Sequence, residues 1–370
     1  MTLIQLEIIA ICSLVAISCA LPGSFLVLRG ISMMSDAISH SILLGIVLSF
    51  FITKTLHSPL LFIGAVLAGI ATVVLVELIL ATNRLKKDAT IGFIFPIFFA
   101  TGILLISKFT GNIHLDTDAV LLGEVAFAPF NRLYINGINL GPYALWWSGL
   151  TAILNSAIIF LYYKEFKLTS FDPQLASSLG FSNRLMHYIL MIMTSITAVT
   201  AFNTAGSILV VGFMIIPPAT AYLITSRLSH LLIISCILGI SAASMGYISA
   251  FLLNISIAGA ITTVMGLIFT AILLLSPEKG IITKLLDLNQ KKIKFGNQML
   301  LIQLLDHETQ PNVTFENTIS NMTLHMKWTK KFIKNILKYS IQKGHIQRKG
   351  NNLTLTPLGR EIAKRFMVLT

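Results

Sequence analysis

The chain has 370 residues, of which 55% are hydrophobic and only 11% are charged, and its mean hydropathy is +0.82. Soluble domains have about a quarter of their residues charged, so this composition excludes a soluble globular protein. Its apolar runs are long enough to cross a bilayer as helices. We therefore predict an all-α polytopic membrane protein.

Positive charge is concentrated near the C-terminus. The net charge is +12, with 14 Lys/Arg and 4 Asp/Glu in residues 291–370 but 13 and 11 in residues 1–290. Nearly the same boundary separates apolar sequence from ordinary amphipathic sequence. The sequence therefore predicts two domains, a membrane domain over residues 1–288 and a small basic domain over residues 289–370.

Nine apolar segments are each long enough, or nearly so, to cross about 30 Å of hydrocarbon as a helix. They are Ile8–Leu28, Ile31–Ile52, Pro59–Ala81, Ile91–Ser107, Tyr143–Tyr163, Leu185–Phe202, Gly206–Ile224, Leu231–Leu253 and Ala258–Leu275. The first lacks a basic start and a small-x-small cleavage site, which favours a retained span over a signal peptide. The second and the seventh contain polar residues or prolines that are typical of half-helices. We therefore predict eight or nine transmembrane helices.

Lys and Arg residues indicate the orientation of these segments. If the nine segments alternate, one side receives Arg29, residues 84–87, residues 164–184, Arg227 and Lys284. The positive-inside rule makes this side the cytoplasm. We expect a multi-pass protein of a bacterial inner membrane, with the C-terminal domain in the cytoplasm and the N-terminus outside.

The stretch from Arg29 to His40 carries Asp36 and His40 four residues apart. On a helix this spacing places both side chains on one face, one turn apart. A carboxylate and an imidazole can bind a divalent transition metal, and in a membrane such groups usually face a cavity or a pathway. The alternative is a helix-stabilising Asp–His pair near a membrane face. Because Arg29 marks the cytoplasmic side, Asp36 is expected about two turns into the membrane and His40 one turn deeper.

The predicted cytoplasmic loop after the fifth span contains a short helix signal. Asp172 and Pro173 are typical of a helix start and Gly180 of a helix stop, with Phe171 and Ala176 beside and within the segment. One interpretation is an ordinary interfacial helix. The other is a coupling helix that docks into a separate ATPase subunit.

Six motifs follow one another along the chain. They are VLRGISMMSDAISH (27–40), KDATIG (87–92), the segment 171–180, GSILV (206–210), IPPATA (216–221) and SPEKG (276–280). In this order they resemble the permease subunits of zinc, manganese and iron ABC transporters, the ABC-3 family, over about residues 5–285. The resemblance implies a homodimeric or otherwise paired permease, an ABC ATPase subunit, and an extracytoplasmic metal-binding protein that delivers the cargo. It also implies a transient metal site at Asp36 and His40, and ATPase coupling through Phe171, Asp172, Pro173, Ala176 and Gly180.

Two further carboxylates are candidate metal ligands. Glu124 matches a Gly-Asp/Glu element of the family and follows an outer loop that also carries His114, Asp116 and Asp118. Glu77 lies within an apolar run. It is either an intramembrane ligand or a structural carboxylate that extends toward the cytoplasmic interface.

The basic C-terminal domain has the pattern of three helices, a hairpin and a last helix. The helices are expected at Asn297–His307, Phe315–Met322, Trp328–Gln342 and Leu358–Val368, with strands at 344–348 and 353–355. This order resembles a winged helix, and residues 353–363 are similar to the wing and following helix of metal-dependent DtxR-like repressors. DNA contacts are predicted for Lys330, Lys331 and Lys334 on the third helix and for Lys349 on the wing. The alternative is a basic face attracted to anionic membrane lipid or to partner proteins.

The sequence contains no Gly-x-x-x-x-Gly-Lys-Ser/Thr phosphate-binding loop, so ATP hydrolysis is expected from another subunit and the chain is not an enzyme by itself. The leading hypothesis is the permease subunit of an ABC importer for manganese, zinc or iron, with the metal as cargo and with no permanently bound cofactor. The second hypothesis is a membrane-tethered winged-helix transcriptional regulator that responds to metal.

Overall fold

The computed structural model describes residues 2–55, 58–109, 125–135, 138–277, 279–308, 328–350 and 352–367. The chain forms two compact units, Met1–Pro277 and Glu278–Thr370, which we call the membrane unit and the tail unit. This division precedes the 288/289 boundary predicted from composition. The difference arises because the first helix of the tail unit already begins at Ile281.

Eight helices in the described part of the chain are long and apolar enough to cross a membrane. They are α1 (Leu3–Leu28), α2 (Met33–Thr53), α3 (Pro59–Ala81), α4 (Lys87–Phe109), α6 (Tyr143–Leu161), α9 (Asn183–Ile224), α10 (Leu228–Leu253) and α11 (Ile257–Leu275). They overlap the predicted segments closely, because short polar or glycine-containing turns separate the apolar runs. The prediction of a polytopic helical membrane protein is confirmed.

Helix α9 contains both the sixth and the seventh predicted segments. It has 42 residues and breaks at Gly206, whose φ of 77° and ψ of 165° are not helical. A positive φ costs glycine little because it has no Cβ, so the chain can change direction at this position. Pro217 and Pro218 lie in the second arm, downstream of the break.

The contacts of the two arms of α9 show that they run in opposite directions. Asn155 of α6 donates hydrogen bonds to the Ser18 carbonyl of α1 and to the Thr197 hydroxyl on the first arm, so Thr197 lies level with the middle of α1. A straight helix would carry Met214 about 25 Å beyond Thr197, toward the N-terminus of α1. Instead Met214 packs against Gly23, which lies closer to the C-terminus of α1 than Ser18 does. A Cβ atom added to Gly23 would lie 2.1 Å from the Met214 carbonyl oxygen. The second arm therefore returns along α1, and counting the arms separately gives nine segments.

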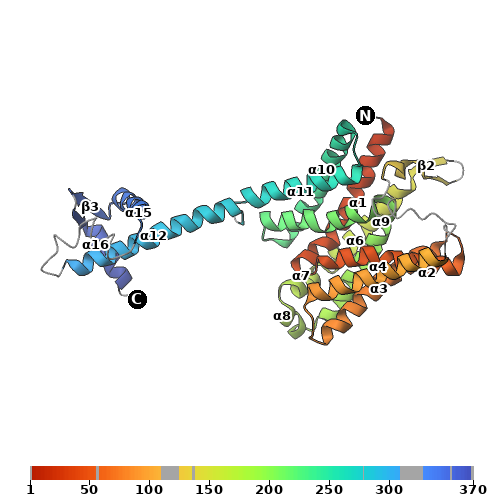
Figure 1. Ribbon diagram of the computed structural model, residues 1–370, viewed down its shortest axis with the longest axis horizontal. Coiled ribbons are helices and arrows are strands. Elements are labelled where there is room, and N and C mark those ends of the chain that lie inside the picture. The colour runs from red at the N-terminus through yellow and green to blue at the C-terminus, as the bar shows by residue number, and fades with distance from the viewer. Residues whose placement is uncertain are drawn as a thin grey trace. The chain divides into compact units, whose positions relative to one another are not determined.

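Close helix contacts and locally bonded hydroxyl groups hold the membrane unit together. Helices α2, α3 and α4 lie side by side (Figure 1). An added Cβ at Gly45 of α2 would lie 2.2 Å from the Gly64 carbonyl oxygen of α3, so glycine permits this close approach. Buried hydroxyls such as those of Thr72 and Thr194 donate to the carbonyl four residues earlier. Such bonds satisfy polar side chains where lipid offers no partner.

Two connections contain elements that the sequence did not predict. Between α4 and α6 lie a short 3-10 helix, η1 (Val125–Phe130), and an antiparallel hairpin of β1 (Arg132–Ile135) and β2 (Ile138–Pro142). Arg132 at the start of this hairpin forms a 3.0 Å ion pair with Glu7 of α1. Between α6 and α9 the predicted short helix is present as α8 (Pro173–Ser178). An additional helix, α7 (Tyr163–Phe171), precedes it.

The tail unit contains a long helix, a shorter helix, a hairpin and a last helix. They are α12 (Ile281–His307), α15 (Lys330–Gln342), β3 (Ile346–Lys349), β4 (Asn352–Leu355) and α16 (Pro357–Met367). The two strands pair antiparallel, with Ile346 opposite Leu355 and Lys349 opposite Asn352. These elements match the predicted ones in type and order. The helix predicted at Phe315–Met322 lies outside the described residues.

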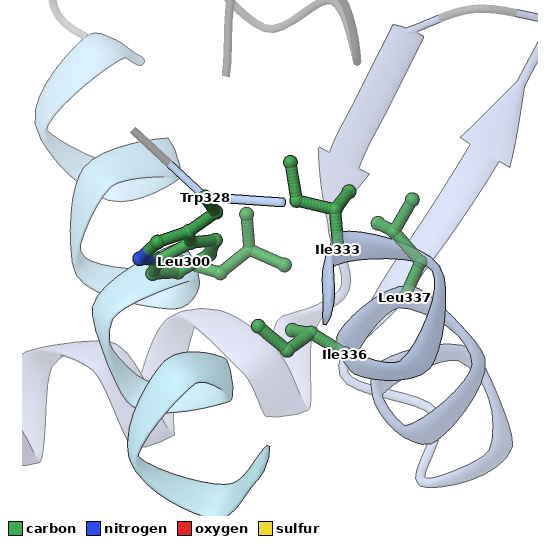
Figure 2. A pocket seen from close by; sticks show the side chains of 5 residues that line it. All are labelled: Leu300, Trp328, Ile333, Ile336 and Leu337. Carbon is green, nitrogen blue, oxygen red and sulfur yellow. The ribbon is translucent and has the colours of Figure 1, made fainter. Parts of the chain in front are cut away.

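The tail unit has its own small apolar core. Figure 2 shows Leu300 of α12 and Trp328 facing Ile333, Ile336 and Leu337 of α15. The cavity among these side chains is about 10 Å³. It holds one water at most, so this core is a packing site rather than a ligand pocket.

Candidate functional site

Asp36 and His40 lie together on one face of α2, as their spacing predicts. Helix α2 begins at Met33, so Asp36 lies in its first turn and His40 one turn further on. Nε2 of His40 lies 3.3 Å from Oδ1 of Asp36, and the two side chains are 24% and 27% exposed, respectively. Arg29 to Ser32 form a turn before α2 starts, and the expected depth of Asp36 in the membrane stays a prediction.

Two aromatic rings of α4 enclose the imidazole of His40. The Phe95 ring lies 5.5 Å from it at an interplanar angle of 28°, and the Phe99 ring lies 5.5 Å away at 74°. The rings restrict the imidazole while the Asp36 carboxylate remains partly accessible. Ser39 takes no part in this arrangement, because its hydroxyl donates to the Ser35 carbonyl at 2.8 Å.

Glu77 links α3 to the first arm of α9. Its Oε1 lies 2.8 Å from Nε2 of His187, and its Oε2 accepts a hydrogen bond from the hydroxyl of Tyr188. Both carboxylate oxygens are therefore engaged by protein groups. The sequence offered one signal for these partners, a histidine and a tyrosine near the start of an apolar segment, where such residues commonly mark functional or structural contacts. Whether Glu77 binds metal stays a prediction.

The remaining predicted metal ligand, Glu124, lies outside the described residues, as do His114, Asp116 and Asp118. Within the described part of the chain, no three His, Cys, Asp or Glu side chains come together as a metal site. Among the described residues of one copy, Asp36 and His40 are thus a pair of two donors.

The predicted coupling residues form a compact turn around α8. The Asp172 carboxylate accepts a hydrogen bond from the backbone N–H of Leu175 at 3.0 Å, and Pro173 is the first residue of the helix. Gly180 ends the segment with a φ of +87°, in the left-handed region that favours glycine. Ala176 is fully buried, whereas Phe171 is 55% exposed.

Asn183 attaches α8 to the beginning of α9. Its side-chain amide donates to the Pro173 carbonyl at 2.7 Å and to the Ser177 hydroxyl at 2.8 Å. The helix α9 that starts at Asn183 carries His187 and Tyr188 one turn later. Two hydrogen bonds therefore connect α8 to the start of α9.

Arg29 attaches α7 to the turn that precedes α2. Its guanidinium donates to the hydroxyls of Thr169 at 2.9 Å and Ser170 at 3.1 Å, and it lies 5.9 Å from the Phe166 ring centre. Burial lowers the pKa of Arg29 to about 10, which leaves it protonated at neutral pH. Arg29 was predicted only as an orientation signal. Its partners were not found because they lie about 140 residues away in sequence.

The predicted DNA-contacting lysines are described in part. Lys331 and Lys334 are exposed on α15, on the side opposite its buried Ile333 and Ile336. The side chains of Lys330 and Lys349 lie outside the described part of the structure. DNA binding stays a prediction.

A model of the ABC 3 transport family matches residues 2–276, which is nearly the whole membrane unit. The chain belongs to the ABC 3 transport family. The paired carboxylate and imidazole on α2 and the exposed turn around α8 are therefore features of a transport protein.

Curated relatives of this ABC 3 chain are similar over most of their length. The manganese transport system membrane protein MntD of Bacillus subtilis is 45% identical over 290 residues, which cover 78% of this chain and 98% of MntD. The zinc transport system membrane protein TroD of Treponema pallidum is 40% identical over 359 residues, covering 97% of this chain and 98% of TroD. The similarity to TroD therefore extends through the tail unit.

A solved structure shares the fold of the membrane unit. It is PsaBC from Streptococcus pneumoniae in complex with Fab, with a TM-score of 0.63 and 27% identity. The match covers 75% of this ABC 3 chain and 94% of the PsaBC chain. The matched share of this chain is close to the share that the membrane unit occupies.

Proposed function

We propose that this chain is the membrane-spanning permease subunit of an ABC importer for manganese or zinc. The family assignment supports the transport class, and MntD and TroD are named for these two metals. Iron, the third metal predicted from the sequence, has no support in these relatives. The observation that carries the proposal for this chain's own residues is the Asp36–His40 pair, enclosed by aromatic rings.

The donor types of this pair suit transient binding. A carboxylate and an imidazole accept manganese and zinc without the thiolate that retains soft metals. Two donors leave a metal coordination shell incomplete, so the remaining positions are filled by water, by the predicted ligand Glu124 outside the described residues, or by a second copy of the permease. Incomplete coordination favours release as well as capture, which a transport path requires.

Coupling to ATP hydrolysis is proposed to start at α8. Phe171, Leu175 and Leu179 are 55%, 46% and 58% exposed, and they form an apolar surface on which a separate ATPase subunit docks. Motion of α8 is transmitted to α9 through Asn183 and, through α7, to Arg29 and the turn before α2. Asp36 and His40 lie on the first two turns of α2, so their access changes with this motion.

The surroundings of the permease follow from this arrangement. We place α8 and the tail unit on the cytoplasmic side, where the positive-inside rule puts the basic loops. A metal-binding protein then delivers cargo from the opposite side. We further infer that the tail unit is a winged-helix module, because its described helices and hairpin follow the predicted order, with the helix predicted at Phe315–Met322 outside the described residues.

The proposal is tested by metal uptake in proteoliposomes that contain the chain with its ATPase subunit. Asp36→Ala combined with His40→Ala is expected to abolish ATP-driven uptake of radioactive manganese or zinc, while assembly with the ATPase persists. Ser39→Ala is the matched control on the same helix, because the Ser39 hydroxyl bonds only its own helix. It is expected to keep full uptake.

The possible outcomes separate the class from the site. Normal uptake by the double variant would overturn the assignment of Asp36 and His40 but leave the transport class intact. Failure of the unaltered complex to move either metal would overturn the proposed cargo.

A further inference from the structure

Helix α12 has two halves whose apolar residues behave differently. In its C-terminal half, Leu300, Leu301 and Leu304 are at most 2% exposed and belong to the core of the tail unit. In its N-terminal half, apolar side chains are exposed instead. They are Ile281 (45%), Ile282 (44%), Leu285 (61%) and Leu288 (47%). The first turns of α12 therefore present an apolar surface that the tail core does not use.

These exposed residues form one face of the helix. At 100° per residue, Ile281, Ile282, Leu285 and Leu288 fall within an arc of about 120°. The opposite arc carries polar residues, among them Asp287 and Gln290. The first half of α12 is therefore amphipathic, and in the described part of the tail unit nothing covers its apolar side.

Lysines accompany this apolar face. Lys284 and Lys291 lie beside one edge of it, Lys292 lies within its arc one turn beyond Leu288, and Lys294 lies on the opposite side. All four side chains are exposed. A helix with an apolar face and lysines beside that face and just beyond it is typical of segments that lie in the interface of an anionic membrane. Lysine stems can extend along the apolar face and still place their ammonium groups among lipid phosphates.

The position of α12 in the chain brings it close to a bilayer. It begins at Ile281, and the last candidate span, α11, ends at Leu275. Six backbone steps span at most about 20 Å, so the first turn of α12 must remain near the end of α11. The hydroxyl of Ser276 also donates to the Leu223 carbonyl at the end of α9, which shortens the reach of the linker.

We infer that the first half of α12, residues 281–294, lies in the headgroup region of the membrane and anchors the tail unit to anionic phospholipid. The apolar face enters the boundary of the acyl chains, and the lysines contact lipid phosphates. Each lysine near an anionic surface strengthens such binding by about five-fold. The inference concerns the tail unit and holds whether or not the chain transports metal.

The test measures the depth of single positions in the full chain. Cys12, Cys19 and Cys236 are replaced by alanine, and a spin-labelled cysteine is introduced singly at Ile282, Leu285 or Leu288, or at the control position Gln290. The chain is reconstituted in nanodiscs of phosphatidylethanolamine and phosphatidylglycerol. Collision of the label with oxygen, which concentrates in lipid, is compared with collision with a water-soluble nickel chelate. This comparison is repeated with the zwitterionic lipid phosphatidylcholine.

The expected result is a helical pattern. Labels at 282, 285 and 288 collide preferentially with oxygen, and the label at 290 collides preferentially with nickel. The difference in oxygen and nickel accessibility between position 290 and the other three positions decreases in phosphatidylcholine. It also decreases after replacement of Lys284, Lys291, Lys292 and Lys294 by glutamine. Equal access of nickel to all four labelled positions would overturn the inference, since it would place α12 in water. Protection that appears only after addition of the ATPase subunit or of duplex DNA would also overturn it, because the partner would then be a macromolecule other than lipid.

Discussion

The membrane unit and the tail unit use charged residues in opposite ways. In the membrane unit charges are rare, and Arg29, Asp36 and Glu77 each contact specific groups on the same or a neighbouring helix. In the tail unit charges are abundant and mostly exposed around an apolar core, as Lys331 and Lys334 are. An ionisable side chain is expensive in lipid and inexpensive in water. A single charge is therefore informative about function in the first unit and nearly uninformative in the second.

The two relatives differ in how much of this chain they match. MntD is matched over 98% of its length but leaves about a fifth of this chain without a counterpart, whereas TroD is matched together with the tail unit. The stretch matched to MntD is nearly as long as the membrane unit, which raises the question whether the membrane unit alone is sufficient for transport. Four predictions test this division between the two units, beginning with changes inside the membrane unit.

The largest effect is expected at Gly180, which ends the coupling segment with a φ of +87°. Gly180→Val places a β-branched residue in a left-handed conformation, which costs at least about 1–2 kcal/mol and displaces α8 from its docking position. ATP-driven metal uptake should fall by about ten-fold or more. Gly180→Asn is the matched control, because asparagine tolerates this conformation and an added Cβ meets nothing within 4 Å. Equal uptake by the two variants would show that this backbone conformation does not matter for coupling.

A smaller effect is expected at Arg29, which connects α7 to the turn before α2 through Thr169 and Ser170. Arg29→Ala removes two charge-assisted hydrogen bonds, each worth about 1.5–3 kcal/mol, so the turn before α2 loosens. ATP-driven uptake should decrease several-fold while the ATPase subunit remains bound. Arg84, an exposed arginine between α3 and α4, provides the control as Arg84→Ala. If both alanine variants lowered uptake equally, the link through Arg29 would have no special role.

The sequence predicted most of the membrane unit because the bilayer imposes a strict length and composition on each helix. Asp36 and His40 were found because their four-residue spacing is a local pattern. Contacts that join distant segments were not found, such as Arg29 with Thr169, because they depend on how helices pack. The reversal within α9 was indicated by Gly206 but not established by it, since a glycine in an apolar run is also compatible with a continuous helix.

In the tail unit the sequence predicted one helix well and missed the start of another. The lysine-rich third helix was recognised because apolar residues recur at helical spacing, and α15 buries Ile333, Ile336 and Leu337 accordingly. The sequence did not predict that α12 runs without a break from Ile281. Its apolar residues lie on different sides of the helix in its two halves, so no single helical periodicity extends over the whole helix. The position of the boundary between the units depends on that helix.

Removal of residues 291–370 is expected to have a small effect on transport. The deletion removes the apolar core of the tail unit together with all of its strands and leaves the membrane unit intact. Uptake per assembled complex should stay within about two-fold of the full chain, because the steps of transport take place within the membrane unit. Amounts of chain and of ATPase in the proteoliposomes are quantified in parallel. If the truncated chain assembled normally with the ATPase subunit but lost uptake, the tail unit would be required for transport.

The smallest effect is expected from protonation of His345 in the tail unit. Its Nδ1 lies 3.2 Å from the side-chain nitrogen of Asn297, and burial, followed by the nearby charge of Lys343, lowers its pKa below the ordinary value. In the unfolded chain the imidazole titrates at about pH 6.5. Because its pKa is lower in the folded state, the unfolded state binds more protons than the folded state below this pH. The free energy of unfolding of the tail unit should therefore be highest above that pH and decline slightly as the pH falls toward the lower, folded-state value.

Trp328 reports this change because it packs against Phe332 at the tail core, with ring centres 5.5 Å apart. The replacements Trp146→Phe and Trp147→Phe leave Trp328 as the only tryptophan of the full chain. Denaturant unfolding of the tail is then followed by fluorescence between about pH 7.5 and pH 5, a range that brackets the histidine titration. His345→Gln keeps a hydrogen-bond acceptor for Asn297 without a titrating group, so its unfolding should vary less with pH. An unchanged slope in that variant would assign the pH dependence to other groups of the tail, and the position of His345 against α12 would then have no part in its stability.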